Sequence, residues 1–146
     1  MWRAATSDDD EAIVRLSLAL FAEDPSPEII TADQVRRTLI AFREHPVRER
    51  AVVLEIDGRI AGYAFLINYW SNELGGEICT IDELYVEADL RGRGYGTSLI
   101  ASLRDFVALE LEVTPANAKA QALYERLGFR VKKNAVMRKK FSSGST

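Results

Sequence analysis

A glycine-rich stretch with two arginines, RGRGYG at residues 91–96, is the part of the sequence whose composition points most directly to ligand binding. It follows the apolar run LYV at residues 84–86 and precedes apolar residues at helical spacing. Glycine has no Cβ, so main-chain N–H groups can approach a ligand closely. The start of a helix also presents unpaired N–H groups and a partial positive charge. The stretch is therefore predicted to bind an anion of phosphate size.

Two common phosphate-binding motifs do not fit these residues. A dinucleotide-binding turn needs the spacing G-x-G-x-x-G in the first βα unit, whereas here the glycines fall as G-x-G-x-G after a predicted hairpin. A P-loop needs a lysine after its last glycine, and Thr97 follows Gly96. The loop must therefore belong to another kind of anion site.

A third pattern fits, and it combines two motifs. The first is R-x-x-G-x-G, formed by Arg91, Gly94 and Gly96 after IDELYVEADL; the second is N-x-x-A-x-x-L-Y-E-x-x-G-F, which begins at Asn117 and contains Tyr124. In this order, with a strand and a helix between them, they closely resemble the GNAT superfamily of acetyl-CoA-dependent N-acetyltransferases. The resemblance covers most of the chain, and VLEIDGRIAGYAFL is similar to that family's second and third strands.

The resemblance implies where acetyl-CoA would bind. The pyrophosphate would lie on the N–H groups of the glycine loop, and the pantetheine arm would pair with the fourth strand, which usually carries a bulge and splays away from the fifth. A main-chain N–H near Leu84 would polarise the thioester carbonyl. Asn117 would hold the far wall, although it would also serve as an ordinary helix N-cap. The residues predicted to bind acetyl-CoA are Leu84, Tyr85, Val86, Arg91, Gly92, Arg93, Gly94, Tyr95, Gly96, Thr97 and Asn117.

The resemblance also implies direct attack by an amine on the thioester. A lysine-like amine has a pKa of about 10.4 and is mostly protonated at neutral pH, so a base is needed. The resemblance favours Glu83 as the base, because a carboxylate at this end of the fourth strand has that role in some members of the family. Asp82 and Glu83 face opposite sides of a regular strand, so normally only one of them faces the cleft, and Asp82, Glu77 or an ordered water are the alternatives. Tyr124 is the predicted general acid for the departing thiolate. Cys79 is interpreted as an apolar strand residue rather than a nucleophile.

The acceptor is not identified by the sequence. Aromatic and acidic residues occur where this superfamily shapes its acceptor site, and they suit a cationic amine, small or on a protein. Three alternatives stay open: a non-catalytic acetyl-CoA or CoA sensor, transfer of another acyl group or to a hydroxyl, and an interaction domain with basic C-terminal strands. The acceptor-side residues are Phe21, Glu23, Asp24, Tyr69, Trp70, Asn72 and Glu73.

Composition excludes several classes of protein. The 146 residues are 47% hydrophobic and 28% charged, as in a folded domain. A net charge of −3 argues against nucleic-acid binding, and no apolar stretch is long enough for a membrane span. One cysteine and one histidine cannot form a His/Cys metal cluster, so no metal is expected. A cytoplasmic location is expected from the cysteine count, and a homodimer from the resemblance.

The elements that must position these residues form a mixed α/β (α+β) domain over residues 1–141, with a flexible tail at 142–146. The resemblance implies a mostly antiparallel twisted sheet of six to seven strands, flanked by about four helices, with splayed fourth and fifth strands. Sequence patterns place strands at 2–5, 51–56, 59–70, 77–86 and 111–114, with one or two more within 129–141, and helices at 7–22, 31–45, 97–109 and 117–127.

Overall fold

The computed structural model describes residues 1–141, so the predicted tail at 142–146 lies outside the described residues. The chain divides into two compact units, an N-terminal unit (Met1–Glu112) and a C-terminal unit that begins at Val113.

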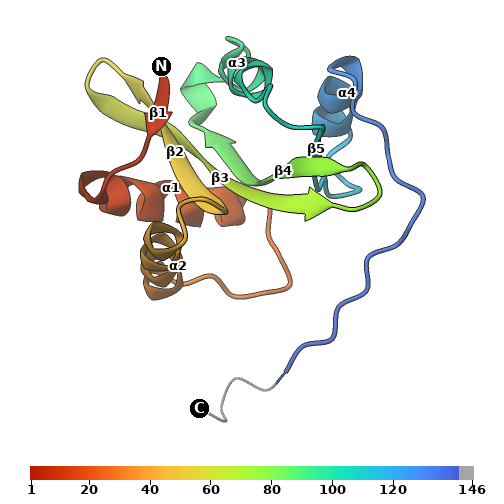
Figure 1. The fold of residues 1–146 in the computed structure, drawn as a ribbon. Coiled ribbons are helices and arrows are strands. Elements are labelled where there is room, and N and C mark those ends of the chain that lie inside the picture. Colours follow the sequence, from red (N-terminus) through yellow and green to blue (C-terminus); the bar gives the residue numbers. More distant parts are fainter. Residues whose placement is uncertain (142–146) are drawn as a thin grey trace. The chain divides into compact units, whose positions relative to one another are not determined.

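A five-stranded sheet forms the centre of the N-terminal unit (Figure 1). The first four strands pair antiparallel in chain order, and the fifth pairs parallel with the fourth. Asp57 and Gly58, with φ of 51° and 77°, form the tight turn that the sequence predicts between the second and third strands. The strands are β1 (Trp2–Ala4), β2 (Glu49–Ile56), β3 (Arg59–Ser71), β4 (Gly76–Val86) and β5 (Ala108–Leu111).

Helices cover both faces of this sheet. Helices α1 (Asp10–Glu23) and α2 (Ala32–Glu44) lie on one face, and α3 (Tyr95–Ser102) lies on the other (Figure 1). Each face has its own core. The α1/α2 core contains Ile13, Leu16, Leu39, Tyr63 and Phe65, and the α3 core contains Ala64, Leu66, Cys79, Ile81 and Leu99.

The helix starts follow from side-chain caps. Thr31 and Gln34 form the predicted capping box of α2, with bonds of 3.1 and 2.7 Å. The first helical segment begins one residue earlier than predicted. Thr6, not Ser7, is its N-cap, and a short 3₁₀ turn (Ser7–Asp9) precedes α1. The reason is that the Asp9 carboxylate accepts from the Thr6 N–H at 2.8 Å.

Two sequence predictions near β5 are wrong in their boundaries. The helix predicted at 97–109 ends at Ser102, and the strand predicted at 111–114 lies at 108–111. The Val107 N–H already donates to the Glu77 carbonyl, so the chain has joined the sheet there. Leu103 and Phe106 pack on the α3 core from outside the helix. The helical spacing of these two residues in the sequence therefore reflects burial against the core rather than a continuation of the helix.

The strands predicted within 129–141 are also absent, so the described sheet has five strands rather than six or seven. β-propensity produces a strand only when one face is buried against neighbours. Four large apolar side chains of this segment are instead 73–94% exposed; they are Val131, Val136, Met137 and Phe141.

The C-terminal unit contains α4 (Ala118–Arg126), as predicted. Asn117 caps this helix, because its side-chain oxygen accepts from the Ala120 N–H at 3.2 Å. Gly128, with φ of 100°, follows the end of the helix, which is the usual role of a glycine there.

Candidate active site

β4 contains a bulge directly before Glu83, the residue predicted to act as the general base. The pairing with β3 passes from Phe65–Glu83 directly to Leu66–Ile81, which leaves Asp82 as an extra residue. Without it, Ile81 and Glu83 would lie on one face of the sheet. With it, Ile81 packs in the α3 core, whereas Glu83 points toward α1.

The other edge of β4 opens just beyond the bulge. Pairing with β5 ends at Ile81–Leu111, while β4 continues to Val86. Residues 82–86 therefore have no strand partner on this side among the described strands. Because main-chain N–H and C=O groups of an edge strand are open to pairing with another extended chain, this segment can bind one. It contains Leu84, Tyr85 and Val86, the predicted pantetheine-binding residues.

Glu83 is half-buried, and its two carboxylate oxygens differ. Oε1 accepts from the Tyr63 hydroxyl at 2.5 Å and from the Ser17 hydroxyl at 3.4 Å. Oε2 has no hydrogen-bond donor among the described residues. Burial raises the pKa of Glu83 above its ordinary value, and the charge of Asp82 raises it further, whereas the bonds from Tyr63 and Ser17 oppose the rise. Such a carboxylate is suited to accept a proton.

The two other carboxylates that the sequence offers as bases are placed differently. Asp82 is an exposed residue at the bulge. Its carboxyl group is nevertheless partly shielded from solvent, and this desolvation raises its pKa, with a further contribution from the charge of Glu112. Glu77 forms an ion pair with Arg48 at 2.8 Å. It lies six residues before Glu83, which is roughly 20 Å along a strand.

The glycine loop leaves its N–H groups open. Gly92 and Gly94 have φ of 78° and 84°, and a Cβ added at either would meet no atom within 4 Å. The first main-chain bond of α3 runs from the Ser98 N–H to the Gly94 carbonyl at 2.9 Å. Among the described residues, no main-chain oxygen accepts from the N–H groups of 92–97. The loop thus has both the donors and the space that a pyrophosphate requires.

Neighbouring side chains hold this loop. The Trp2 indole N–H donates to the Tyr95 carbonyl at 2.8 Å. The Arg91 guanidinium binds Glu23 and lies 5.1 Å above the Tyr85 ring. Arg93 is exposed and forms no ion pair within residues 1–141. Of the two loop arginines, Arg93 is therefore the one whose charge is available to an anion.

The predicted acid belongs to the C-terminal unit. Tyr124 is half-buried on α4, with its ring 5.8 Å from that of Phe129 in an edge-to-face contact. Burial raises the pKa of Tyr124 above its ordinary value, so the phenol stays protonated at neutral pH. Asn117 caps the same helix, which is one of the two roles that its position allows. Their approach to Glu83 and to the glycine loop stays a prediction.

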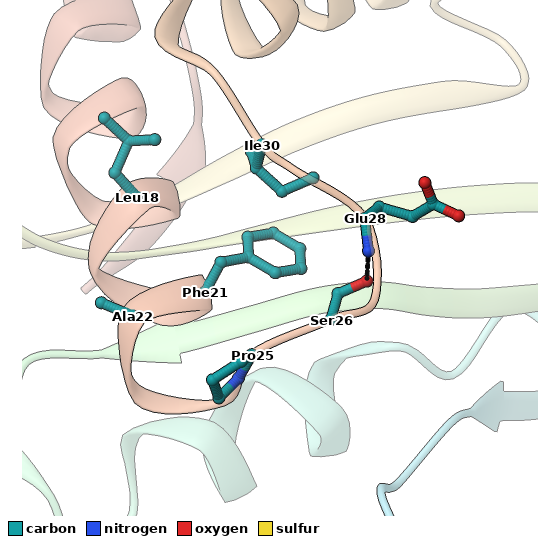
Figure 2. Close-up of a pocket in the computed structure, with 7 residues that line it drawn as sticks. All are labelled: Leu18, Phe21, Ala22, Pro25, Ser26, Glu28 and Ile30. Atoms are coloured by element: carbon teal, nitrogen blue, oxygen red, sulfur yellow. Dashed lines mark hydrogen bonds between the residues drawn. The ribbon is translucent and has the colours of Figure 1, made fainter.

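A hollow of about 300 Å³ lies between α1 and the segment that follows it. Figure 2 shows Phe21 and Ile30 directed toward each other across it, while the Glu28 N–H donates to the Ser26 hydroxyl at 3.1 Å. Phe21 is one helical turn beyond Ser17, which contacts Glu83. The lining residues are Leu18, Phe21, Ala22, Pro25, Ser26, Glu28 and Ile30.

Comparison with known proteins identifies the family of this chain. The sequence profile described as acetyltransferase (GNAT) family matches residues 15–129. The chain belongs to the acetyltransferase (GNAT) family. This confirms the resemblance inferred from the two motifs.

Relatives of this GNAT chain carry acetyltransferase names. The mycothiol acetyltransferase of Clavibacter michiganensis is 32% identical over 134 residues, which are 86% of this chain and 40% of that protein. An uncharacterized N-acetyltransferase of Methanocaldococcus jannaschii is 39% identical over 87 residues, 55% of this chain and 38% of that protein. The chain thus spans about two fifths of the length of these curated relatives.

Solved structures share the fold at low sequence identity. A possible acetyltransferase from Clostridium difficile has a TM-score of 0.83 and 18% identity, with 97% of each chain covered. A ribosomal-protein-alanine N-acetyltransferase from Brucella melitensis has a TM-score of 0.73 and 20% identity, covering 96% of this chain and 99% of that one. These likenesses confirm the predicted fold class.

Sequence reasoning missed the two partners of Glu83. Tyr63 and Ser17 are both fully buried, and a hydroxyl in such a position needs a hydrogen-bond partner. Ser17 lies among the apolar residues of α1 that face the core, and that placement was the available signal.

Among residues 1–141, no three His, Cys, Asp or Glu side chains gather as metal ligands. No helix in this part of the chain is long and apolar enough to cross a membrane.

Proposed function

We propose that this chain is an N-acetyltransferase that moves the acetyl group of acetyl-CoA to a primary amine by direct attack within a ternary complex. The observation that carries the proposal is that the open edge of β4 at residues 82–86 is followed, after a 3₁₀ turn (Ala88–Leu90), by the unpaired N–H groups of the loop at 92–97. An extended amide-bearing arm that ends in a pyrophosphate matches both parts of this surface.

The chain's own groups then have separate binding roles. The N–H groups of 92–97 hold the pyrophosphate, with Arg93 adding charge. The edge of β4 pairs with the pantetheine amides, and a main-chain N–H near Leu84 stabilises the charge that develops on the carbonyl oxygen. Acetyl-CoA supplies the thioester that is attacked.

Proton transfer is assigned to two side chains. Glu83 takes a proton from the ammonium through Oε2, directly or through one water, while Tyr63 and Ser17 hold Oε1. The amine nitrogen then forms a bond with the acetyl carbon as the carbon–sulfur bond breaks. Tyr124 gives its phenolic proton to the departing thiolate. The second proton of the amine and the proton held by Glu83 leave to solvent, and the phenol recovers its proton from solvent.

The acceptor is proposed to be an amine that lies over the hollow beside α1. The hollow is lined mostly by apolar side chains together with Glu28, and Glu23 directly follows its lining residue Ala22; an apolar hollow with a carboxylate suits a cation on an apolar stem. Two similar proteins, a mycothiol acetyltransferase and a ribosomal-protein-alanine N-acetyltransferase, have names that suggest two kinds of acceptor, a small molecule and a protein. Homodimer formation and a cytoplasmic location stay predictions.

The test begins with calorimetric titration of the purified chain with acetyl-CoA, desulfo-CoA and ATP. Binding of the first two but not of ATP is expected, because only they carry the pantetheine arm. A panel of polyamines, amino sugars, amino acids and peptides, monitored for free thiol, then identifies the acceptor class. Absence of acetyl-CoA binding by the folded chain would contradict the proposal. Binding without thiol release on any amine would favour the sensor instead.

A further inference from the structure

An ion pair joins the glycine loop to the end of α1. The two terminal nitrogens of Arg91 donate to the two carboxylate oxygens of Glu23, each at 3.0 Å. The Arg91 Nε donates to the Val86 carbonyl at 2.8 Å, and the guanidinium lies over the ring of Tyr85. Arg91, at the start of the loop, thus contacts the end of α1 and the end of β4 at once.

These contacts leave Arg91 few donors for a phosphate. A guanidinium has five N–H groups in a rigid fork, and Glu23 and Val86 engage all three of its nitrogens. The sequence motif places this arginine beside the pyrophosphate, yet its charge is balanced by a carboxylate. Arg91 is therefore placed to hold the loop in position rather than to bind the anion directly.

Glu23 lies between two functional segments. It is the last residue of α1, and its neighbours Ala22 and Pro25 line the hollow proposed for the acceptor. Arg91 lowers the pKa of Glu23, and a contact with Tyr85 lowers it further, so the pair stays charged at neutral pH. The ion pair between the end of α1, beside the hollow proposed for the acceptor, and the glycine loop consequently persists at neutral pH.

We propose that Glu23 is a positioning residue for acetyl-CoA, and that it acts through Arg91 by holding the glycine loop against the end of α1. This inference rests on the proposed function, since it assumes that the loop binds the acyl donor. It adds that the segment bordering the hollow and the donor loop are coupled through this one ion pair.

The direction in which Glu23→Ala changes the affinity for acetyl-CoA separates a positioning role from simple electrostatics. Coenzyme A is a polyanion, so removal of a nearby carboxylate should tighten its binding if charge alone matters. If Glu23 positions the loop, Glu23→Ala should instead weaken acetyl-CoA binding by about twofold to fivefold, as expected for loss of an exposed ion pair. Calorimetry at constant ionic strength measures the change.

A matched control and a double variant complete the experiment. Glu11 on the same helix forms a similar pair with Arg36, at 2.8 and 3.0 Å, away from the glycine loop. Glu11→Ala should leave acetyl-CoA affinity unchanged. If Glu23 acts through Arg91, then the variants Glu23→Ala, Arg91→Ala and the double variant should bind about equally weakly, because either change breaks the same link.

Hydrogen exchange provides a second readout that does not depend on affinity. Saturating acetyl-CoA should protect amides of residues 92–97 and of 20–30 in the wild type. In Glu23→Ala, protection at 92–97 should persist at saturation, while protection at 20–30 should be lost.

Each outcome has one meaning. Unchanged or tighter binding by Glu23→Ala, additive losses in the double variant, or retained protection at 20–30 would overturn the positioning role and leave the proposed function intact. A wild-type chain that binds no acetyl-CoA would overturn both. Because Glu23 and Arg91 side chains are each 45% exposed, the variants are expected to fold, which thermal unfolding checks.

Discussion

The surroundings of Glu83 suit the proton transfer that we propose for this side chain. One oxygen is occupied by two hydroxyl donors, and the other faces no donor among the described residues. Burial raises the pKa of this carboxyl, while the hydroxyls keep it from rising further. The arrangement fixes the orientation of the group and leaves one basic site.

Glu83→Gln should lower kcat by about 100-fold or more, the range for loss of a general base, with acetyl-CoA affinity unchanged. Glutamine keeps an oxygen for Tyr63, so the packing survives. The matched control is Glu77→Gln on the same strand, which should retain its activity. Equal kcat in the Glu83 variant and the wild type would remove Glu83 from the mechanism.

The same variant should change how stability depends on pH. Because the folded pKa of Glu83 is raised, its favourable contribution is present below its unfolded pKa and is lost as pH rises through the folded pKa. Glu83→Gln removes this titration. At neutral pH the variant should therefore be at least as stable as the wild type in thermal unfolding, whereas a lower melting temperature would contradict this view of the group.

Tyr63→Phe should shift the pH profile of kcat/KM. The base must be ionised, so activity falls on the acidic side as Glu83 takes up a proton. The Tyr63 hydroxyl lowers the pKa of Glu83, and its removal should move the acidic limb to higher pH. Tyr69→Phe, which removes a tyrosine–glutamate bond to Glu110, is the control and should leave the limb in place. An unshifted limb in Tyr63→Phe would count against Glu83 as the group that sets it.

Tyr124→Phe should lower kcat by about 100-fold or more if the phenol protonates the thiolate. Phenylalanine retains the edge-to-face contact with Phe129, so folding is not affected. Calorimetry should give the wild-type affinity for acetyl-CoA. An unchanged kcat would show that another group or water supplies the proton.

At the scale of elements, the bulge in β4 and the glycine loop that follows this strand have complementary effects on the proposed binding site. The bulge turns Glu83 toward α1, and the early end of the β4–β5 pairing leaves an open edge. The chain then enters a loop whose two glycines have positive φ. We propose that strand, edge and loop together bind one extended ligand that ends in an anion.

Gly94→Ala tests the loop, and Gly58→Ala is its matched control. Both glycines have positive φ, at 84° and 77°, with open space around the missing Cβ. Each change should cost about 1 kcal/mol of stability through backbone strain alone. Only Gly94→Ala should also weaken acetyl-CoA binding, because its backbone shapes the anion site. Equal affinities in the two variants would place the anion elsewhere.

At the scale of the molecule, ligand binding should appear as stabilisation. A ligand at 100 times its dissociation constant stabilises the folded state by about 2.7 kcal/mol, so acetyl-CoA should raise the melting temperature by roughly 5–10 °C. ATP at the same concentration should give a much smaller shift. Equal shifts with both compounds would mean that the pantetheine arm makes no contact with the chain.

The sequence by itself determined the family, the fold class and the central elements. Local signals carried these predictions: the Asp57–Gly58 turn, the capping box of α2 and the two motifs around Gly94 and Tyr124. Such signals depend on a few adjacent residues, so they can be interpreted before any tertiary contact is known.

Only the tertiary structure decided which face each residue of β4 uses and which partners it meets. Alternation alone could not choose between Asp82 and Glu83, because a single extra residue reverses every later side chain. Nor could local sequence patterns show that Arg91 forms an ion pair with Glu23, or that Leu103 and Phe106 pack on the α3 core from outside a helix. These facts depend on contacts between segments far apart in the chain, and local patterns do not encode them.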